Sequence, residues 1–164
     1  MQLYIMRHGE ASMKADTDAS RPLTKQGELE ANLMALWLSN MNVRIDHILV
    51  SPYIRAQQTC SIVTSTLSTK YNEDFQQKVS TVNYITPSGS AREVHDYIDD
   101  LCSGLSCEHV LIVSHMPLVS YLVAELTVEQ QCPIFQTAAI AQINYQCSSM
   151  NGELVRIVSP IDLC

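Results

Sequence analysis

The sequence predicts an α/β fold, a layered α/β/α sandwich around a mostly parallel central sheet. Three short apolar runs, at residues 3–6, 47–50 and 110–113, have the length and composition of buried strands. Segments with helical spacing of apolar residues lie between them, and this alternation is typical of a parallel sheet covered by helices. A hairpin near the carboxyl end adds at least one antiparallel strand.

The first two predicted helices follow capping residues. Thr24 can cap a helix over 25–41. Ser51 and Pro52 form an N-cap and first-turn pair for a helix over 53–68. The face of the first helix that we expect to pack on the sheet carries Leu29, Leu33, Leu36 and Trp37.

The later elements complete the alternation. We expect a strand of mixed polarity over 75–82, a helix over 89–103 capped by Ser88, and a helix from Pro117 through Leu126. The apolar stripe of the helix over 89–103 consists of Val94, Tyr97, Ile98 and Leu101. Strands over 139–145 and 154–158 close the chain, with Asn151-Gly152 as the hairpin turn.

Composition indicates one compact domain over residues 1–164. A chain of 164 residues has about the length of a single domain with a sizeable core. Its net charge of −7 argues against binding to nucleic acid, which requires a basic face. No apolar run reaches the 18 or so residues of a membrane span, and Arg7 and His8 interrupt the place of a signal peptide. We expect a cytoplasmic protein.

The cysteines give no metal or redox motif. They are Cys60, Cys102, Cys107, Cys132, Cys147 and Cys164. None forms a CxxC pair, so a zinc or redox site has little support. Most are expected to be reduced thiols of a cytosolic protein, although the even number also permits disulfides.

Polar residues follow all three apolar runs. Arg7, His8 and Gly9 come directly after the first, Arg55 follows the second within a few residues, and His115 ends the third. Ligands of open α/β sheets bind outside the carboxyl ends of the strands, where these side chains converge. Two arginines and two histidines at one sheet edge predict a phosphate site.

The motifs at these strand ends resemble the histidine phosphatase superfamily, the phosphoglycerate mutase-like proteins. They are Arg7-His8-Gly9, Leu23-Thr24 with Gly27, Ser51-Pro52-x-x-Arg55-Ala56-x-x-Thr59 and Ser114-His115. Within the superfamily the chain looks most like the small bacterial SixA-type phosphohistidine phosphatases. The features behind that likeness are the short length, Ser20-Arg21-Pro22-Leu23-Thr24, Thr86-Pro87-x-Gly89 and His115-Met116-Pro117-Leu118-Val119.

A phosphoryl group carries negative charge on its oxygens, and arginine and protonated histidine can stabilise that charge. We expect Arg7, Arg55 and His115 to bind the phosphoryl group, and Gly9 to add a backbone N–H. The resemblance implies Arg21 as a third cation. No Walker loop or aspartate pair suggests magnesium, so no metal or other cofactor is expected.

His8 is the expected nucleophile, which attacks phosphorus and forms a phosphohistidine intermediate that water hydrolyses. A backbone carbonyl should hold its other ring nitrogen and fix the tautomer. The remaining histidines, His47, His95 and His109, are expected to be structural. Glu10 is either a residue of the pocket rim or a solvated loop acid.

One departure from the wider family bears on the substrate. Mutases and sugar phosphatases of the superfamily carry a glutamate general acid after the third strand, whereas residues 81–86 contain no carboxylate. Without an acid, imidazole leaves more easily than an alkoxide. We therefore expect hydrolysis of phosphohistidine on a phosphotransfer domain or phosphocarrier protein. A displaced acid, a broad small-molecule phosphomonoesterase and a non-catalytic phosphate-binding module are the alternatives.

Overall fold

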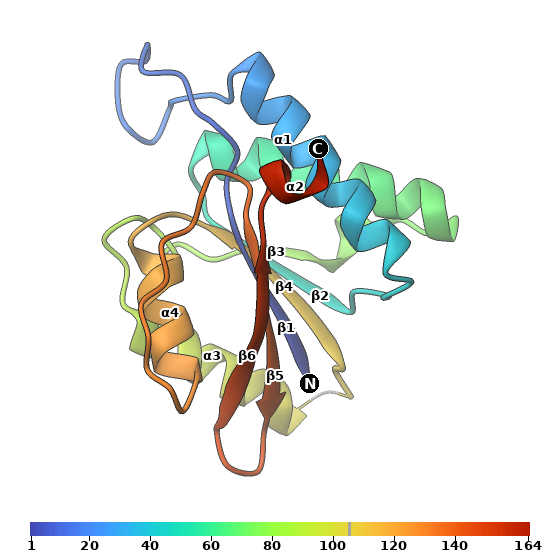
Figure 1. The fold of residues 1–164 in the computed structure, drawn as a ribbon, viewed down its shortest axis with the longest axis vertical. Coiled ribbons are helices and arrows are strands. Elements are labelled where there is room, and N and C mark those ends of the chain that lie inside the picture. Colours follow the sequence, from blue (N-terminus) through green and yellow to red (C-terminus); the bar gives the residue numbers. More distant parts are fainter. Residues whose placement is uncertain (105) are drawn as a thin grey trace.

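The computed structural model describes residues 1–104 and 106–164, in which a six-stranded sheet lies between two layers of helices (Figure 1). The strands are β1 (Gln2–Arg7), β2 (His47–Val50), β3 (Val79–Thr81), β4 (His109–Ser114), β5 (Ile140–Gln146) and β6 (Asn151–Val158). Their order across the sheet is β3-β2-β4-β1-β5-β6. The layered α/β/α prediction is confirmed, as is the mostly parallel sheet.

Strand direction places the carboxyl ends of five strands, all except β5, at one edge of the sheet. The pairs β3–β2, β2–β4 and β4–β1 are parallel, and β5 is antiparallel to both β1 and β6. In the register of the central pair, Arg7 lies opposite Ser114. The residues that follow β1 and β4 therefore begin side by side.

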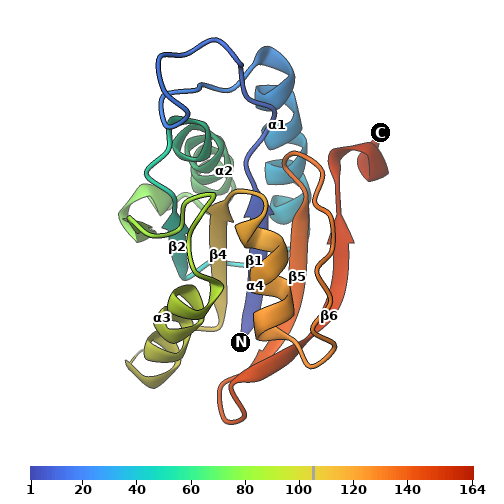
Figure 2. The same ribbon diagram turned by 90° about the vertical axis from the view of Figure 1, so that its left-hand side faces the viewer.

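The helices cover the two faces of the sheet in pairs. They are α1 (Lys25–Asn40), α2 (Ile54–Tyr71), α3 (Ala91–Gly104) and α4 (Leu118–Leu126). Helices α1 and α2 lie on one face, and α3 and α4 lie on the other (Figures 1 and 2). Along β1, Leu3 and Ile5 belong to the core beneath α3 and α4, whereas Tyr4 and Met6 belong to the core beneath α1 and α2. Every central residue of β1 is thus buried, as its continuous apolar run predicts.

Helix α1 begins as predicted but buries a different face. Thr24 caps it by accepting a hydrogen bond from the Gly27 N–H. The expected packing face is wrong, because the side chains of Leu29 and Leu36 are 61% and 53% exposed. The buried positions are Gly27, Glu30, Ala31, Met34, Ala35, Leu38 and Ser39. Small residues on this face let α1 approach its neighbours closely. The spacing of the leucines does not reveal which face of the helix is buried.

Three further boundaries differ from prediction. Residues 75–82 contain a short 3-10 helix (Phe75–Lys78) before β3, because Asp74 caps that turn by accepting from the Gln76 N–H. Helix α2 begins at Ile54, because Ser51 hydrogen-bonds outside the helix, to His115. The amino end of α3 is held by Ser90, which accepts from the Glu93 N–H, and not by Ser88.

The final hairpin turns earlier than predicted. Asn151 and Gly152 lie inside β6, opposite Gln146 and Tyr145. The turn is formed by residues 147–150, in which Met150 takes the left-handed backbone conformation at φ 56°. Gly152 allows the two strands of the hairpin to pack closely, because a Cβ at this position would collide with the Asn144 carbonyl oxygen.

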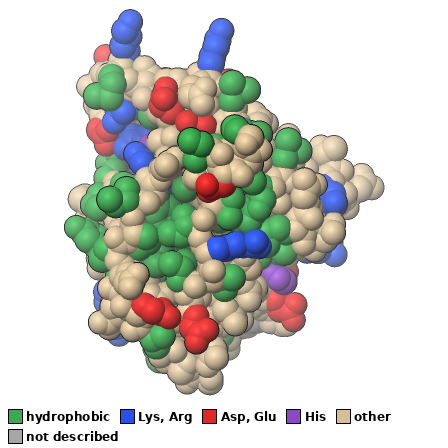
Figure 3. All heavy atoms as spheres, viewed as in Figure 1, with side chains coloured by type: hydrophobic (Ala, Val, Ile, Leu, Met, Phe, Trp, Pro, Cys, Tyr) green, Lys and Arg blue, Asp and Glu red, His purple; other side chains and the backbone are tan. Residues whose placement is uncertain are grey.

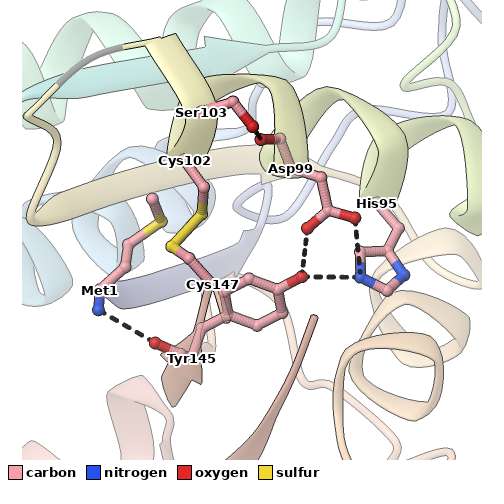
Figure 4. The surroundings of a disulfide bond; sticks show 7 residues. All are labelled: Met1, His95, Asp99, Cys102, Ser103, Tyr145 and Cys147. Carbon is pink, nitrogen blue, oxygen red and sulfur yellow. Dashed lines mark hydrogen bonds and ion pairs between the residues drawn. A yellow bond between two sulfur atoms is a disulfide. The ribbon is translucent and has the colours of Figure 1, made fainter. Parts of the chain in front are cut away.

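One pair of cysteines forms a disulfide, so the expectation of reduced thiols does not extend to them. Cys102 in α3 and Cys147 in the turn after β5 are bonded, with their Cα atoms 5.8 Å apart (Figure 4). The cysteines at positions 60, 107, 132 and 164 are free. Tertiary packing of α3 against the hairpin creates the pairing, which joins residues 45 positions apart.

His95 lies in a polar network beside this disulfide (Figure 4). Its Nδ1 is 3.0 Å from a Glu125 carboxylate oxygen, and its Nε2 is 2.8 Å from the Tyr145 hydroxyl. The same hydroxyl contacts Asp99 of α3. The network links α3, α4 and β5, which agrees with a structural histidine.

None of the described helices has the length and apolar character that crossing a membrane requires.

Candidate active site

A cavity of about 380 Å³ opens at the carboxyl ends of the central strands. Its lining residues are Arg7, His8, Glu10, Ala11, Asp18, Arg21, Arg55, Pro87, Met116 and Thr137. The long loop between β1 and α1 extends over this edge of the sheet (Figure 2). In the space-filling view, basic, acidic and histidine side chains lie together beneath that loop, at the upper left (Figure 3).

His8 follows the last residue of β1, and its side chain is held at both ring nitrogens. The residue is 7% exposed. Nδ1 lies 2.7 Å from the Gly9 carbonyl oxygen, which can only accept, so Nδ1 carries the proton. Nε2 is therefore unprotonated and accepts a hydrogen bond from Arg55 Nε at 3.1 Å. This is the tautomer in which Nε2 can attack phosphorus.

Burial and nearby cations keep both site histidines neutral. Burial, together with Arg55 and Arg7, lowers the pKa of His8 to about 4, although its bond to the Gly9 carbonyl acts in the opposite direction. Burial, His8 and Arg55 lower the pKa of His115 to about 3. The two ring centroids are 5.0 Å apart. At neutral pH the site therefore holds an uncharged imidazole beside arginine side chains.

His115, after β4, is oriented by Ser51 from the end of β2. His115 Nε2 and Ser51 Oγ are 2.6 Å apart, and Ser51 Oγ also accepts from the Tyr53 N–H. When Nε2 of neutral His115 accepts a hydrogen bond from the Ser51 hydroxyl, the ring proton is on Nδ1. The His115 Nδ1 atom is buried without a hydrogen-bond partner. It is thus available to donate to a phosphoryl oxygen.

The expected arginines lie around His8. Arg7 Nη1 donates to the Phe135 carbonyl oxygen at 2.7 Å, while Arg7 Nε is buried and unpartnered. Arg55, at the first turn of α2, is 4% exposed and contacts His8 directly. Arg21 reaches the cavity from the β1–α1 loop, where its Nε donates to the Ser12 carbonyl oxygen at 2.8 Å. The structure thus brings Arg7, Arg21 and Arg55 into one cavity.

The Gly9 N–H is engaged within the protein, and Glu10 lies on the rim of the cavity. The Gly9 N–H donates to Thr59 Oγ1 at 3.1 Å, so this N–H is engaged within the protein. A Cβ on Gly9 would collide with the Gly27 carbonyl oxygen, so close packing of the loop on α1 requires glycine. Glu10 lines the cavity and accepts from the Thr24 hydroxyl at 2.8 Å, which places it on the pocket rim.

Asp18 is a residue of the site that sequence reasoning missed. Its Oδ2 is 3.1 Å from Arg55 Nη2, and its Oδ1 is 3.0 Å from Arg21 Nη1. These arginines lower the pKa of Asp18, chiefly through the hydrogen bond from Arg21. The only sequence signal was its position three residues before Arg21 in a polar loop, which is also typical of a solvated aspartate.

Among the described residues, no group of three or more histidines, cysteines, aspartates or glutamates could hold a metal ion.

The depressed histidine pKa predicts a specific pH dependence of stability. The unfolded chain binds protons at its histidines near pH 6.5, whereas folded His8 binds one only near pH 4. Between these values the unfolded state holds more protons, so the free energy of unfolding falls as the pH falls. We expect His8 to contribute about 2 kcal/mol to the loss between pH 7 and pH 4.5.

Urea unfolding of the wild type and of His8→Gln at both pH values measures this contribution. The variant should lose about 2 kcal/mol less than the wild type. His109→Gln, at the start of β4, is the control. Equal losses in wild type and His8→Gln would show that His8 is not held neutral by the fold.

The comparisons with known proteins agree with this geometry. The family model described as "Histidine phosphatase superfamily (branch 1)" matches residues 3–78. "Phosphohistidine phosphatase SixA" of Escherichia coli (strain K12) is 39% identical over 163 residues, which cover 99% of this chain and 96% of that protein. The "Phosphohistidine phosphatase SixA homolog" of Haemophilus influenzae is 40% identical over 148 residues, 87% of either chain. The "Structure of the protein histidine phosphatase SixA complexed with tungstate" superposes with a TM-score of 0.92 at 38% identity and covers 100% of both chains.

Proposed function

Because the chain belongs to the histidine phosphatase superfamily, we propose that it is a protein phosphohistidine phosphatase that acts through a phospho-His8 intermediate. The observation that carries this proposal is the tautomer of His8. Its unprotonated Nε2 lies beside Arg55, in a cavity that also holds Arg7 and Arg21. The similarity to SixA proteins over most of the chain supports a phosphohistidine substrate.

In the first step, His8 Nε2 attacks phosphorus and forms a new P–N bond. The P–N bond of the substrate breaks, and its imidazole leaves with the electron pair and takes up a proton from solvent water. Arg55 Nε, which donates to His8 Nε2 in the free protein, must turn to a phosphoryl oxygen to free the lone pair. Arg7 Nε and His115 Nδ1 donate to the remaining oxygens; among the described residues, these are the two buried polar side-chain atoms without a hydrogen-bond partner.

In the second step, water attacks the phosphorus of phospho-His8. The P–N bond to His8 breaks, the electron pair returns to Nε2, and inorganic phosphate forms. The carbonyl of Gly9 holds the proton on Nδ1 throughout, so the regenerated ring has the tautomer needed for the next attack. Arginine side chains supply the positive charge, neutral His115 adds a hydrogen-bond donor, and the proposed reaction uses no metal or other cofactor.

The carboxylates of the cavity favour a substrate whose leaving group needs little acid assistance. Asp18 and Glu10 are the acids that line it, and both are hydrogen-bonded within the protein. Arg21 and Arg55 keep Asp18 ionised by lowering its pKa, so it is a poor proton donor. Imidazole is a better leaving group than an alkoxide under these conditions. We therefore propose a phosphohistidine on a phosphotransfer domain or phosphocarrier protein as the substrate.

The relative kcat/KM for three substrates tests this proposal. A phosphohistidine domain should react at least about 100-fold faster than phosphoserine peptide or 3-phosphoglycerate, since ionised Asp18 is a poor proton donor for an alkoxide leaving group. EDTA should leave these rates unchanged. His8→Ala measures the background hydrolysis of the labile P–N bond. If the oxygen esters match the phosphohistidine domain, a broad phosphomonoesterase replaces the proposal.

A further inference from the structure

The carboxylate of Asp18 lies between two arginines of the site. Its Oδ2 accepts from Arg55 Nη2 at 3.1 Å, and its Oδ1 accepts from Arg21 Nη1 at 3.0 Å. The loop between β1 and α1 supplies Asp18 and Arg21, and α2 supplies Arg55. An anion of the protein therefore already bridges two of the cations that would otherwise be free for a phosphoryl group.

All three side-chain nitrogens of Arg55 donate hydrogen bonds in this state. Its Nε donates to His8, its Nη1 to the Asp18 backbone carbonyl at 2.6 Å, and its Nη2 to the Asp18 carboxylate. These bonds use three of the five N–H groups of the guanidinium, and a phosphoryl group that takes the position of the Asp18 carboxylate must exchange the bond at Nη2. Freeing Nε also releases the attacking lone pair of His8.

The contact with the carboxylate is the one that can open at least cost. The Asp18 side chain is 53% exposed, so water can solvate its charge after displacement, whereas Arg55 is only 4% exposed. A phosphoryl group carries a charge of about −1.5 to −2 at neutral pH and outcompetes a singly charged carboxylate for the arginines. The backbone bond from Arg55 Nη1 to the Asp18 carbonyl does not depend on the side chain.

We infer that the Asp18 carboxylate is an internal competitor of the phosphoryl group: it occupies Arg21 and Arg55 in the free protein and is displaced when phosphate binds. This inference rests on the proposed phosphoryl site of the cavity and adds its regulation. Two consequences follow. Weakly charged anions do not occupy the arginines, and the returning carboxylate helps to expel inorganic phosphate after each turnover.

Calorimetric titration of the protein with inorganic phosphate, at fixed ionic strength, tests this role without any turnover. Asp18→Asn preserves the shape of the side chain and the backbone bond to Arg55 but removes the charge. We expect it to bind phosphate about tenfold more tightly than the wild type, because a charge-assisted contact no longer has to be broken. Asp16→Asn removes a charge from the same exposed loop and should change the affinity by less than about twofold, as expected for screened surface charges.

The sign of the change decides between competition and support. If Asp18 merely braces Arg55, then Asp18→Asn loosens the arginine and phosphate binds more weakly. Unchanged or weaker binding, or an equal gain in Asp16→Asn, overturns the inference. Asp18→Ser, which cannot bridge the arginines, should also bind phosphate more tightly, and it decides the question if the asparagine variant does not fold. Because no phosphohistidine is used, a failure here is separate from a failure of the proposed substrate.

Discussion

Replacement of His8 by alanine is expected to lower kcat/KM for a phosphohistidine domain by about 10⁴-fold or more, because the variant has no nucleophile to carry the phosphoryl group. Arg55 and His115 remain in the variant, so binding of the substrate should weaken far less than turnover. Steady-state kinetics, corrected for spontaneous hydrolysis, separates the two effects.

His109→Ala is the matched control for this experiment. It removes the same side chain from the start of β4, outside the residues that line the cavity. It should retain activity within about twofold, as is usual for substitutions away from a functional site. If His8→Ala retained a kcat/KM within tenfold of the wild-type value, another residue would have to be the nucleophile.

Arg55→Ala is expected to lower kcat/KM by about 10²- to 10³-fold for both a phosphohistidine domain and an aryl phosphate. The guanidinium stabilises charge on the phosphoryl oxygens, and that charge is the same for either leaving group. Arg55→Lys keeps the charge but loses the planar fork, so it should recover only part of the rate.

Arg44→Ala is the control for this substitution, since Arg44 is 62% exposed and pairs with Glu73 on the surface. It should retain nearly full activity. A loss in Arg55→Ala that is confined to one of the two substrates would contradict charge stabilisation of the phosphoryl group.

The layered fold could be predicted because its signals are local. The continuous apolar run of β1 reflects burial on both faces, which any central strand of a covered sheet requires. The packed face of α1 could not be predicted, because its small residues meet partners that only the tertiary structure defines. The same limit applies to the pairing of Cys102 with Cys147.

Arg7, His8, Arg55 and His115 could be proposed as site residues from the sequence, because each lies at or shortly after the end of a parallel strand. Arg21 was expected from the family resemblance alone. Arg7 and Ser114 are register partners, so His8 and His115 begin at adjacent places. The orienting role of Ser51 and the bridging position of Asp18 depend on side-chain contacts between distant segments. A loop aspartate gives no periodic or positional signal that would reveal such a contact.

Rapid-quench analysis with a ³²P-labelled phosphohistidine domain tests the central claim most directly. During turnover the protein should carry a label that is stable in base and labile in acid, the behaviour of a phosphorus–nitrogen bond, and peptide mapping should place the label on His8. The label should be absent from His8→Ala. Turnover without a labelled protein, or a label on any other residue, would contradict the account.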